Sequence, residues 1–113
     1  MSSINNLLAL MNEIRDLDPE MQAQAIAVLL VVAQHSAGIQ MQTLGRLVGI
    51  SQSSVSRNVA LLSHTQRYGK PGHDLVVAFE DPTERRRKLV KLNARGQRFV
   101  SRLSRMLESA EQA

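Results

Sequence analysis

The feature that most constrains the fold of this chain is a pair of short helical segments separated by Gly49. The first segment, residues 41–48, is apolar on one side, and Gly49 is expected to end it. The second begins after Ser51, whose hydroxyl is placed to cap the free amides of a helix start. Its buried side follows the i, i+4, i+7 spacing of a helix with Val55, Val59 and Leu62. Two short helices joined by a tight glycine turn predict a helix-turn-helix.

The opposite side of the second segment consists of small or hydrogen-bonding residues. They are Gln52, Ser53, Ser56, Arg57 and Asn58. A helix fits into the major groove of DNA, serines let its backbone come close, and Gln, Arg and Asn offer donors and acceptors that read base edges. The alternative is an ordinary serine-rich surface helix, and the spacing alone does not separate the two.

Charge is distributed unevenly along the chain, whose net charge is +4. No acidic residue occurs between Met21 and His73, and none occurs from Arg85 to Arg105, an interval that holds nine of the fourteen Lys and Arg residues. A phosphate backbone can approach these two windows without repulsion. A basic face that only meets solvent explains the charge equally well. The position of the charge in the fold has to distinguish this interpretation from phosphate binding.

A β-hairpin with a basic tip is predicted after the helix-turn-helix. Residues 75–79 are β-like, residues 81–84 (DPTE) favour a turn, and residues 88–92 alternate between polar and apolar. The basic residues at or just after the tip are Arg85, Arg86, Arg87 and Lys88. An arginine there can enter a minor groove while its neighbours meet phosphates. A hairpin in this place is a wing, so the predicted fold is a winged helix-turn-helix, mainly α with a small β-hairpin.

The remaining helices complete one domain. Residues 3–16 form an amphipathic pattern, and Asp18 and Pro19 are expected to start a second, buried helix that ends near Gln34. Asn93 is placed to cap a last helix over residues 94–111, which carries one apolar face and a stripe of arginines. A length of 113 residues suits a single domain, and we expect one winged-helix domain over residues 1–113.

The sequence contains no constellation typical of an enzyme or a metal site. The chain has no cysteine, which excludes disulfides and thiolate zinc sites. His35, His64 and His73 show no metal-binding spacing, and neither a nucleophile motif nor a phosphate-binding loop occurs. No secretory signal is evident, and the longest apolar run, residues 25–33, is too short to span a bilayer. We therefore expect a cytoplasmic, non-enzymatic protein that binds no metal, cofactor or membrane.

Two motifs together carry a family resemblance. LGRLVGISQSSVSR (44–57) is a helix-turn-helix sequence, and DPTERR (81–86) followed by LVKLN (89–93) and Gly96 covers the wing and the start of the last helix. The stretch from Leu44 to Leu103, about half the chain, resembles the winged-helix domain of the MarR-type bacterial transcription regulators. The resemblance implies a homodimer that binds double-stranded DNA at a palindromic operator. Each protomer would place its recognition helix in a major groove and its wing in the flanking minor groove.

The resemblance also assigns roles to residues. By position, Gln52, Ser53, Ser54, Ser56 and Arg57 would lie at the groove, and Arg86 would be the wing arginine. Glu84 stands where the family usually has an aspartate that orients this arginine, and the longer carboxylate can still pair with it. The terminal helices, residues 3–16 and 94–111, are expected to form the dimer interface, as they do in the family. The chain is shorter than typical members, so we expect the last helix of the family to be missing and the dimer to be smaller or differently arranged.

Several alternatives stay open at this stage. A repressor is the expected regulator, and small-molecule effectors are common in the family, but with one Tyr and two Phe a constitutive DNA binder fits equally well. In a second interpretation the protein is a plasmid or phage DNA-binding factor for replication or partition. In a third, the winged helix is a protein-interaction module whose basic charge serves an acidic partner.

Overall fold

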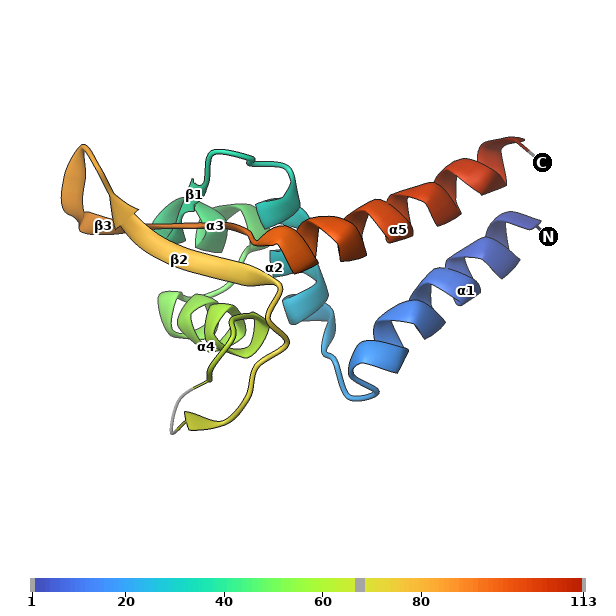
Figure 1. The fold of residues 1–113 in the computed structure, drawn as a ribbon, viewed down its shortest axis with the longest axis horizontal. Helices are drawn as coiled ribbons and strands as arrows, with labels where there is room; N and C mark the ends of the chain where they lie inside the picture. The colour runs from blue at the N-terminus through green and yellow to red at the C-terminus, as the bar shows by residue number, and fades with distance from the viewer. Residues whose placement is uncertain (1, 67–68, 113) are drawn as a thin grey trace.

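The computed structural model describes residues 2–66 and 69–112, which form five helices and a three-stranded sheet (Figure 1). The elements in chain order are α1 (Ser2–Leu17), α2 (Ala23–Ala33), β1 (Ile39–Gln40), α3 (Met41–Val48), α4 (Gln52–Leu62), β2 (Val76–Asp81), β3 (Glu84–Leu92) and α5 (Ala94–Gln112). The predicted fold class, a mainly helical winged helix-turn-helix with a small β-hairpin, is confirmed.

Helix α2 lies at the centre of the core, as its apolar sequence predicts. Every helix and strand contributes to the cluster of buried side chains around it, which consists of Ile14, Val28, Leu29, Val32, Ile39, Leu44, Val55, Val59, Leu62, Leu75, Val76, Val90, Phe99 and Leu103. The predicted buried side of α4 is part of this cluster. One side of α2 still reaches solvent, because Leu30 is 42% exposed.

The start of α2 differs from the prediction. Asp18 and Pro19 do not begin the helix, which starts at Ala23 after an extended Gln22 whose side chain makes no capping hydrogen bond. Asp18 stabilises a turn instead, because its Oδ1 accepts a hydrogen bond of 2.9 Å from the backbone N–H of Glu20. Its Oδ2 lies 2.9 Å from Nε2 of His73, a partner 55 residues away that no local sequence pattern could reveal.

The sheet is antiparallel with the order β1-β3-β2. Two differences from the prediction concern its strands. The short strand β1, which pairs Ile39 with Val90, was not predicted, because two residues are too few to show an alternating pattern. Strand β3 begins at Glu84 and not near residue 88. Lys88 pairs with Glu80 and Glu84 with Asp81, so Arg85, Arg86 and Arg87 lie in the irregular stretch between these two pairs.

Helices α1 and α5 pack side by side and project away from the other elements, which makes the molecule 47 Å long and under 30 Å across (Figure 1). We call α1 and the part of α5 from Phe99 onward the terminal arm. An ion pair of 3.0 Å between Arg102 Nε and Glu13 Oε1 joins the two helices. Helices α3 and α4 and the β2–β3 hairpin lie together at the other end of the molecule from the arm.

Candidate nucleic-acid interface

The turn between α3 and α4 determines which side of α4 faces solvent. Gly49 takes a left-handed conformation (φ 80°) and its N–H donates to the carbonyl of Gly45 at 2.8 Å, which closes α3. Ser51 then caps α4, because its Oγ accepts a hydrogen bond of 3.2 Å from the N–H of Ser54. With Val55 and Val59 buried against α2, the polar side of α4 faces outward.

The candidate residues on α4 fall into two groups. Gln52, Ser53 and Arg57 are exposed, whereas the other three candidates, Ser54, Ser56 and Asn58, are half-buried. Ser54 Oγ accepts a hydrogen bond of 3.0 Å from Arg57, and Asn58 Nδ2 donates to the carbonyl of Ser54 at 2.9 Å. Asn58 Nδ2 also donates to Gln24 of α2 at 3.3 Å. The first group is therefore accessible to a ligand, although Arg57 is bonded to Ser54, while Ser54 and Asn58 are less accessible and are engaged within the protein.

The hairpin of β2 and β3 forms the wing, and its tip is shaped by Asp81. Oδ1 of Asp81 accepts hydrogen bonds from the backbone N–H of Thr83 at 2.9 Å and from its hydroxyl at 2.8 Å. These bonds hold the pKa of Asp81 below its ordinary value of 3.8, and the bond from the backbone N–H of Thr83 contributes most to this lowering. Glu84 contacts Arg86 through the main chain, since its Oε1 accepts the N–H of Arg86 at 3.5 Å. The four predicted wing residues, Arg85 to Lys88, are all exposed.

A hollow of about 190 Å³ lies between the wing and the helix-turn-helix. Its walls come from β1, α3, α4 and β3 and consist of Gln40, Met41, Gln42, Gln52, Arg86, Arg87 and Lys88. Three basic side chains thus share one surface with the first residue of α4, and every polar group in the wall is basic or an amide. The sequence missed Gln40 and Gln42, which carry no periodic signal and are recognisable only by their place in the acid-free stretch.

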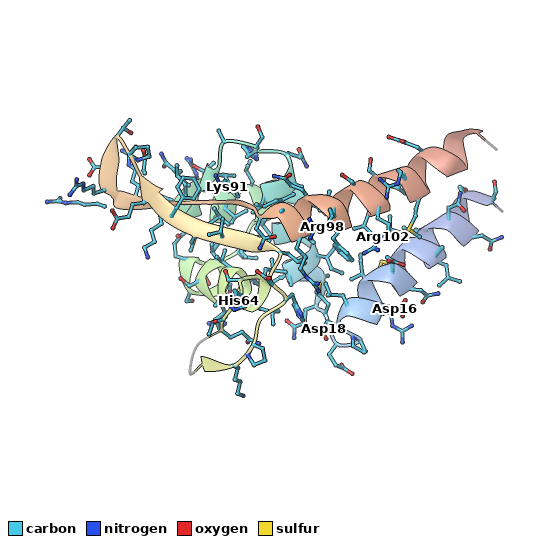
Figure 2. The ribbon with its side chains drawn as sticks, viewed as in Figure 1. Asp16, Asp18, His64, Lys91, Arg98 and Arg102 are labelled. Atoms are coloured by element: carbon cyan, nitrogen blue, oxygen red, sulfur yellow. The ribbon has the colours of Figure 1, made fainter. Side chains whose placement is uncertain are left out.

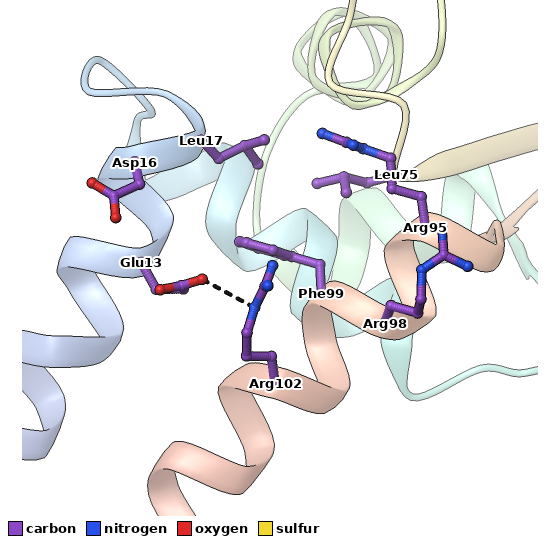
Figure 3. A pocket seen from close by; sticks show the side chains of 8 residues that line it. All are labelled: Glu13, Asp16, Leu17, Leu75, Arg95, Arg98, Phe99 and Arg102. Atoms are coloured by element: carbon purple, nitrogen blue, oxygen red, sulfur yellow. Dashed lines mark ion pairs between the residues drawn. The ribbon is translucent and has the colours of Figure 1, made fainter.

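A second hollow, of about 400 Å³, lies between α1 and α5 (Figure 3). Its charged lining carries both signs, with Glu13 and Asp16 of α1 opposite Arg95, Arg98 and Arg102 of α5. Figure 2 shows Arg98 and Arg102 of the predicted arginine stripe on α5 beside α1, and Arg102 forms the ion pair with Glu13. They belong to a different surface from the wing and α4.

Two properties bear on other kinds of site. In the parts of the chain that the structure describes, no group of three or more His, Asp or Glu residues is placed to hold a metal ion. None of the described helices is both long enough and apolar enough to cross a membrane.

Solved structures place this architecture in a known class. No protein-family model and no curated protein matches the sequence. The PcaV transcriptional regulator from Streptomyces coelicolor, in complex with its natural ligand, is 26% identical and aligns with 82% of this chain and 60% of its own, with a TM-score of 0.62. A MarR-family transcriptional regulator from a Rhodococcus species is 20% identical over 94% of this chain and 67% of its own, with a TM-score of 0.67. The chain has the winged-helix fold of the MarR regulators.

One of the solved structures with this fold contains DNA. The S. aureus MepR–DNA complex is 17% identical, covers 89% of this chain and 74% of its own, and gives a TM-score of 0.74. The family resemblance predicted from the helix-turn-helix and the wing is thus confirmed at the level of the fold. The chain spans 60% of the length of the Streptomyces regulator.

Proposed function

We propose that this chain is a sequence-specific regulator of transcription that binds double-stranded DNA, acts as a repressor in the cytoplasm and catalyses no reaction. A homodimer binds a palindromic operator, with α4 of each protomer in a major groove and each wing in the flanking minor groove. The observation that carries the proposal is the hollow in which Gln52 of α4 and Arg86, Arg87 and Lys88 of the wing meet. The MepR–DNA complex, which has the same fold, supports it.

The chemistry of this surface suits DNA on two counts. Exposed guanidinium and ammonium groups on β3 attract phosphates, and the amide of Gln52 and the guanidinium of Arg57 can form paired hydrogen bonds with base edges. The wing therefore supplies mainly affinity and α4 mainly specificity.

The apolar surface of the terminal arm is the observation that supports the proposed dimer. Large apolar side chains on the arm face solvent although they belong to amphipathic helices; they are Ile4, Leu7, Leu8, Met11 and Leu107. An exposed apolar face of this kind marks a surface that another protein chain covers. A twofold interface uses the same patch on both subunits, and two such arms side by side satisfy this requirement.

The test is selection from a randomised duplex pool, followed by titration of the selected site at several salt concentrations. We expect an inverted repeat with half-sites about one helical turn apart and an affinity that falls steeply with salt. The variant Arg57→Ala is expected to lose discrimination at one base position by about 1–3 kcal/mol. Arg86→Ala is expected to weaken binding to all sequences and to reduce the salt slope.

Arg15→Ala is the matched control, because it removes one positive charge from α1, which is part of neither the helix-turn-helix nor the wing. It should bind the selected site as the parent protein does. Enrichment of no sequence, with Arg57→Ala and Arg86→Ala both behaving like the parent, would contradict the proposal and favour a protein partner. A selected site without two-fold symmetry would contradict the dimer.

A further inference from the structure

The segment from Gly72 to Leu75, which leads into β2, is fastened to the C-terminal end of α4. The backbone N–H of His73 donates to the carbonyl of Leu61 at 2.9 Å, and the N–H of Leu75 donates to the carbonyl of Leu62 at 2.8 Å. Between them, the N–H of Asp74 donates to the carbonyl of Ser63 at 3.1 Å. The segment therefore moves with the last turn of α4.

The side chain of His73 reaches in the other direction, to the end of α1. Its Nε2 lies 2.9 Å from Oδ2 of Asp18, and the two side chains are 17% and 21% exposed. Because a carboxylate only accepts hydrogen bonds, His73 is the donor. Asp18 continues α1, since its own N–H donates to the carbonyl of Ile14 at 3.1 Å. One half-buried contact thus connects the end of the arm helix α1 with the end of α4.

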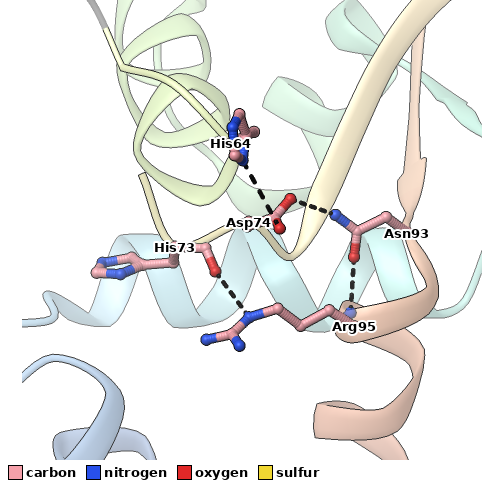
Figure 4. Close-up of polar contacts among 6 residues, drawn as sticks. His64, His73, Asp74, Asn93 and Arg95 are labelled. Atoms are coloured by element: carbon pink, nitrogen blue, oxygen red, sulfur yellow. Dashed lines mark hydrogen bonds and ion pairs between the residues drawn. The ribbon is translucent and has the colours of Figure 1, made fainter. Parts of the chain in front are cut away.

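Within the part of the chain that the structure describes, the other polar contacts of the segment lead to residues at the ends of α4 and α5 and not to α1 (Figure 4). Arg95 Nε donates to the carbonyl of His73 at 3.3 Å, and Asn93 Nδ2 donates to Asp74 Oδ1 at 2.9 Å. His64 Nδ1 lies 3.7 Å from Asp74 Oδ2, but its side chain is 84% exposed. These bonds hold the segment in place whether or not Asp18 is engaged.

We infer that His73 is a positioning residue, which holds α1 at a fixed angle to α4 through Asp18. Its consequence for DNA rests on the proposed function: in a dimer built from the arms, the angle between α1 and α4 sets the distance between the two recognition helices. That distance must match the spacing of the operator half-sites. Loss of the contact leaves α4 folded and able to read bases, but the position of α4 relative to α1 varies. The dimer then has to order its two α4 helices when it binds DNA, which weakens binding.

The angle between α1 and α4 can be measured in the full chain, because it contains no cysteine that would interfere with labelling. Asn5→Cys on α1 and Ser53→Cys on α4 provide two exposed sites for spin labels. Dilution with unlabelled protein restricts the signal in pulsed electron paramagnetic resonance to the distance within one chain. We expect one narrow distance distribution for the parent, and a shifted or broadened one when His73→Ala is added.

Two further variants separate positioning from plain stabilisation. His73→Gln retains an N–H donor toward Asp18 and should restore the narrow distribution, and His64→Ala, which removes the exposed histidine of the same cluster, should not alter it. Asp18→Ser removes the contact from the side of α1, yet its hydroxyl can still accept the N–H of Glu20, so it should reproduce the change. An unchanged distribution in His73→Ala or Asp18→Ser, even with a lower melting temperature, would overturn the inference.

Binding to the selected operator provides the second measurement. His73→Ala should bind about tenfold more weakly, the loss typical of one hydrogen bond to a charged group, and should tolerate altered half-site spacing better than the parent. Equal spacing preferences would overturn the inference. Failure of the parent itself to bind any DNA would contradict the proposed function, while the distance measurement would still test the role of His73.

Discussion

Two glycines illustrate how single residues constrain this protein for different reasons. Gly49 needs its freedom of conformation, because its φ of +80° is left-handed, and a Cβ at this position would meet open space. Gly96 needs its small size, because a Cβ there would collide with the backbone carbonyl of Leu75 where α5 crosses the start of β2. The N–H of Asn93 donates to the same carbonyl at 3.0 Å, so the carbonyl has little room to move.

Replacement of each glycine by alanine should therefore have unequal effects on the free energy of unfolding. Gly49→Ala should lower it by about 1 kcal/mol, the cost of a left-handed alanine. Gly96→Ala should lower it by about 3 kcal/mol, because overpacking against backbone forces α5 away from β2. Urea denaturation followed by circular dichroism measures both values. Equal losses, or a larger loss for Gly49→Ala, would show that the close approach of α5 to Leu75 is not a constraint.

At the scale of one element, the wing depends on a local turn at its tip. The register of β2 and β3 shifts between Glu80 and Asp81, and the two bonds from Thr83 to Asp81 fix the chain where it reverses. The basic strand β3 starts directly after this turn, so the turn determines which way its first side chains point. A weakened turn should loosen the arginines before it affects the core.

The turn should respond to pH in a defined direction. The pKa of Asp81 is lowered in the folded protein, so the carboxylate stabilises the turn above its unfolded value of 3.8, and this contribution is lost as the pH falls below that value. We expect the amide signal of Thr83 in NMR spectra to shift with pH, with a midpoint below 3.8. In Asp81→Asn, whose amide oxygen still accepts but does not titrate, the shift should disappear. A midpoint above 3.8 in the parent would contradict this account.

At the scale of the whole molecule, the terminal arm is the part whose apolar side chains are least completely buried within the chain. Ile14 and Leu103 belong to the core, but Leu8 near the start of α1 is 58% exposed and Leu107 near the end of α5 is 48% exposed. The arm thus buries its base within the chain and leaves its outer part apolar and uncovered. This distribution is expected if a second copy completes the surface.

A charge placed on the apolar face should weaken the proposed dimer without unfolding the protomer. Leu8→Glu should raise the dissociation constant at least about tenfold, because a leucine buried in each subunit contributes about 1.5–3 kcal/mol. Ala9→Glu is the matched control, since it adds the same charge at the neighbouring exposed position, which a helix turns away from Leu8. Sedimentation equilibrium measures both constants. A dimer equally stable in both variants would place the interface elsewhere.

The sequence by itself determined the parts of the fold whose causes are local. The caps at Ser51 and Asn93, the glycine turn at Gly49 and the apolar spacing within α4 all act over a few residues, so the helix-turn-helix could be predicted correctly. The basic wing could be predicted for the same reason, although its second strand begins earlier than its alternating pattern suggests. The candidate residues of α4 and the wing remain predictions until DNA binding is tested.

Only the tertiary structure decided the contacts between segments that are distant in the chain. Asp18 has the local sequence of a helix start, but in the fold its carboxylate lies against His73 and the helix starts at Ala23. Strand β1 exists because β3 provides hydrogen bonds beside it, and Gln40 and Gln42 gain their place near the wing from that pairing. The side chain of Asn58 forms a hydrogen bond to α2 and is engaged within the protein, whereas its neighbour Arg57 is exposed. Such contacts depend on where the folded chain brings two segments together, and spacing along the sequence does not encode that.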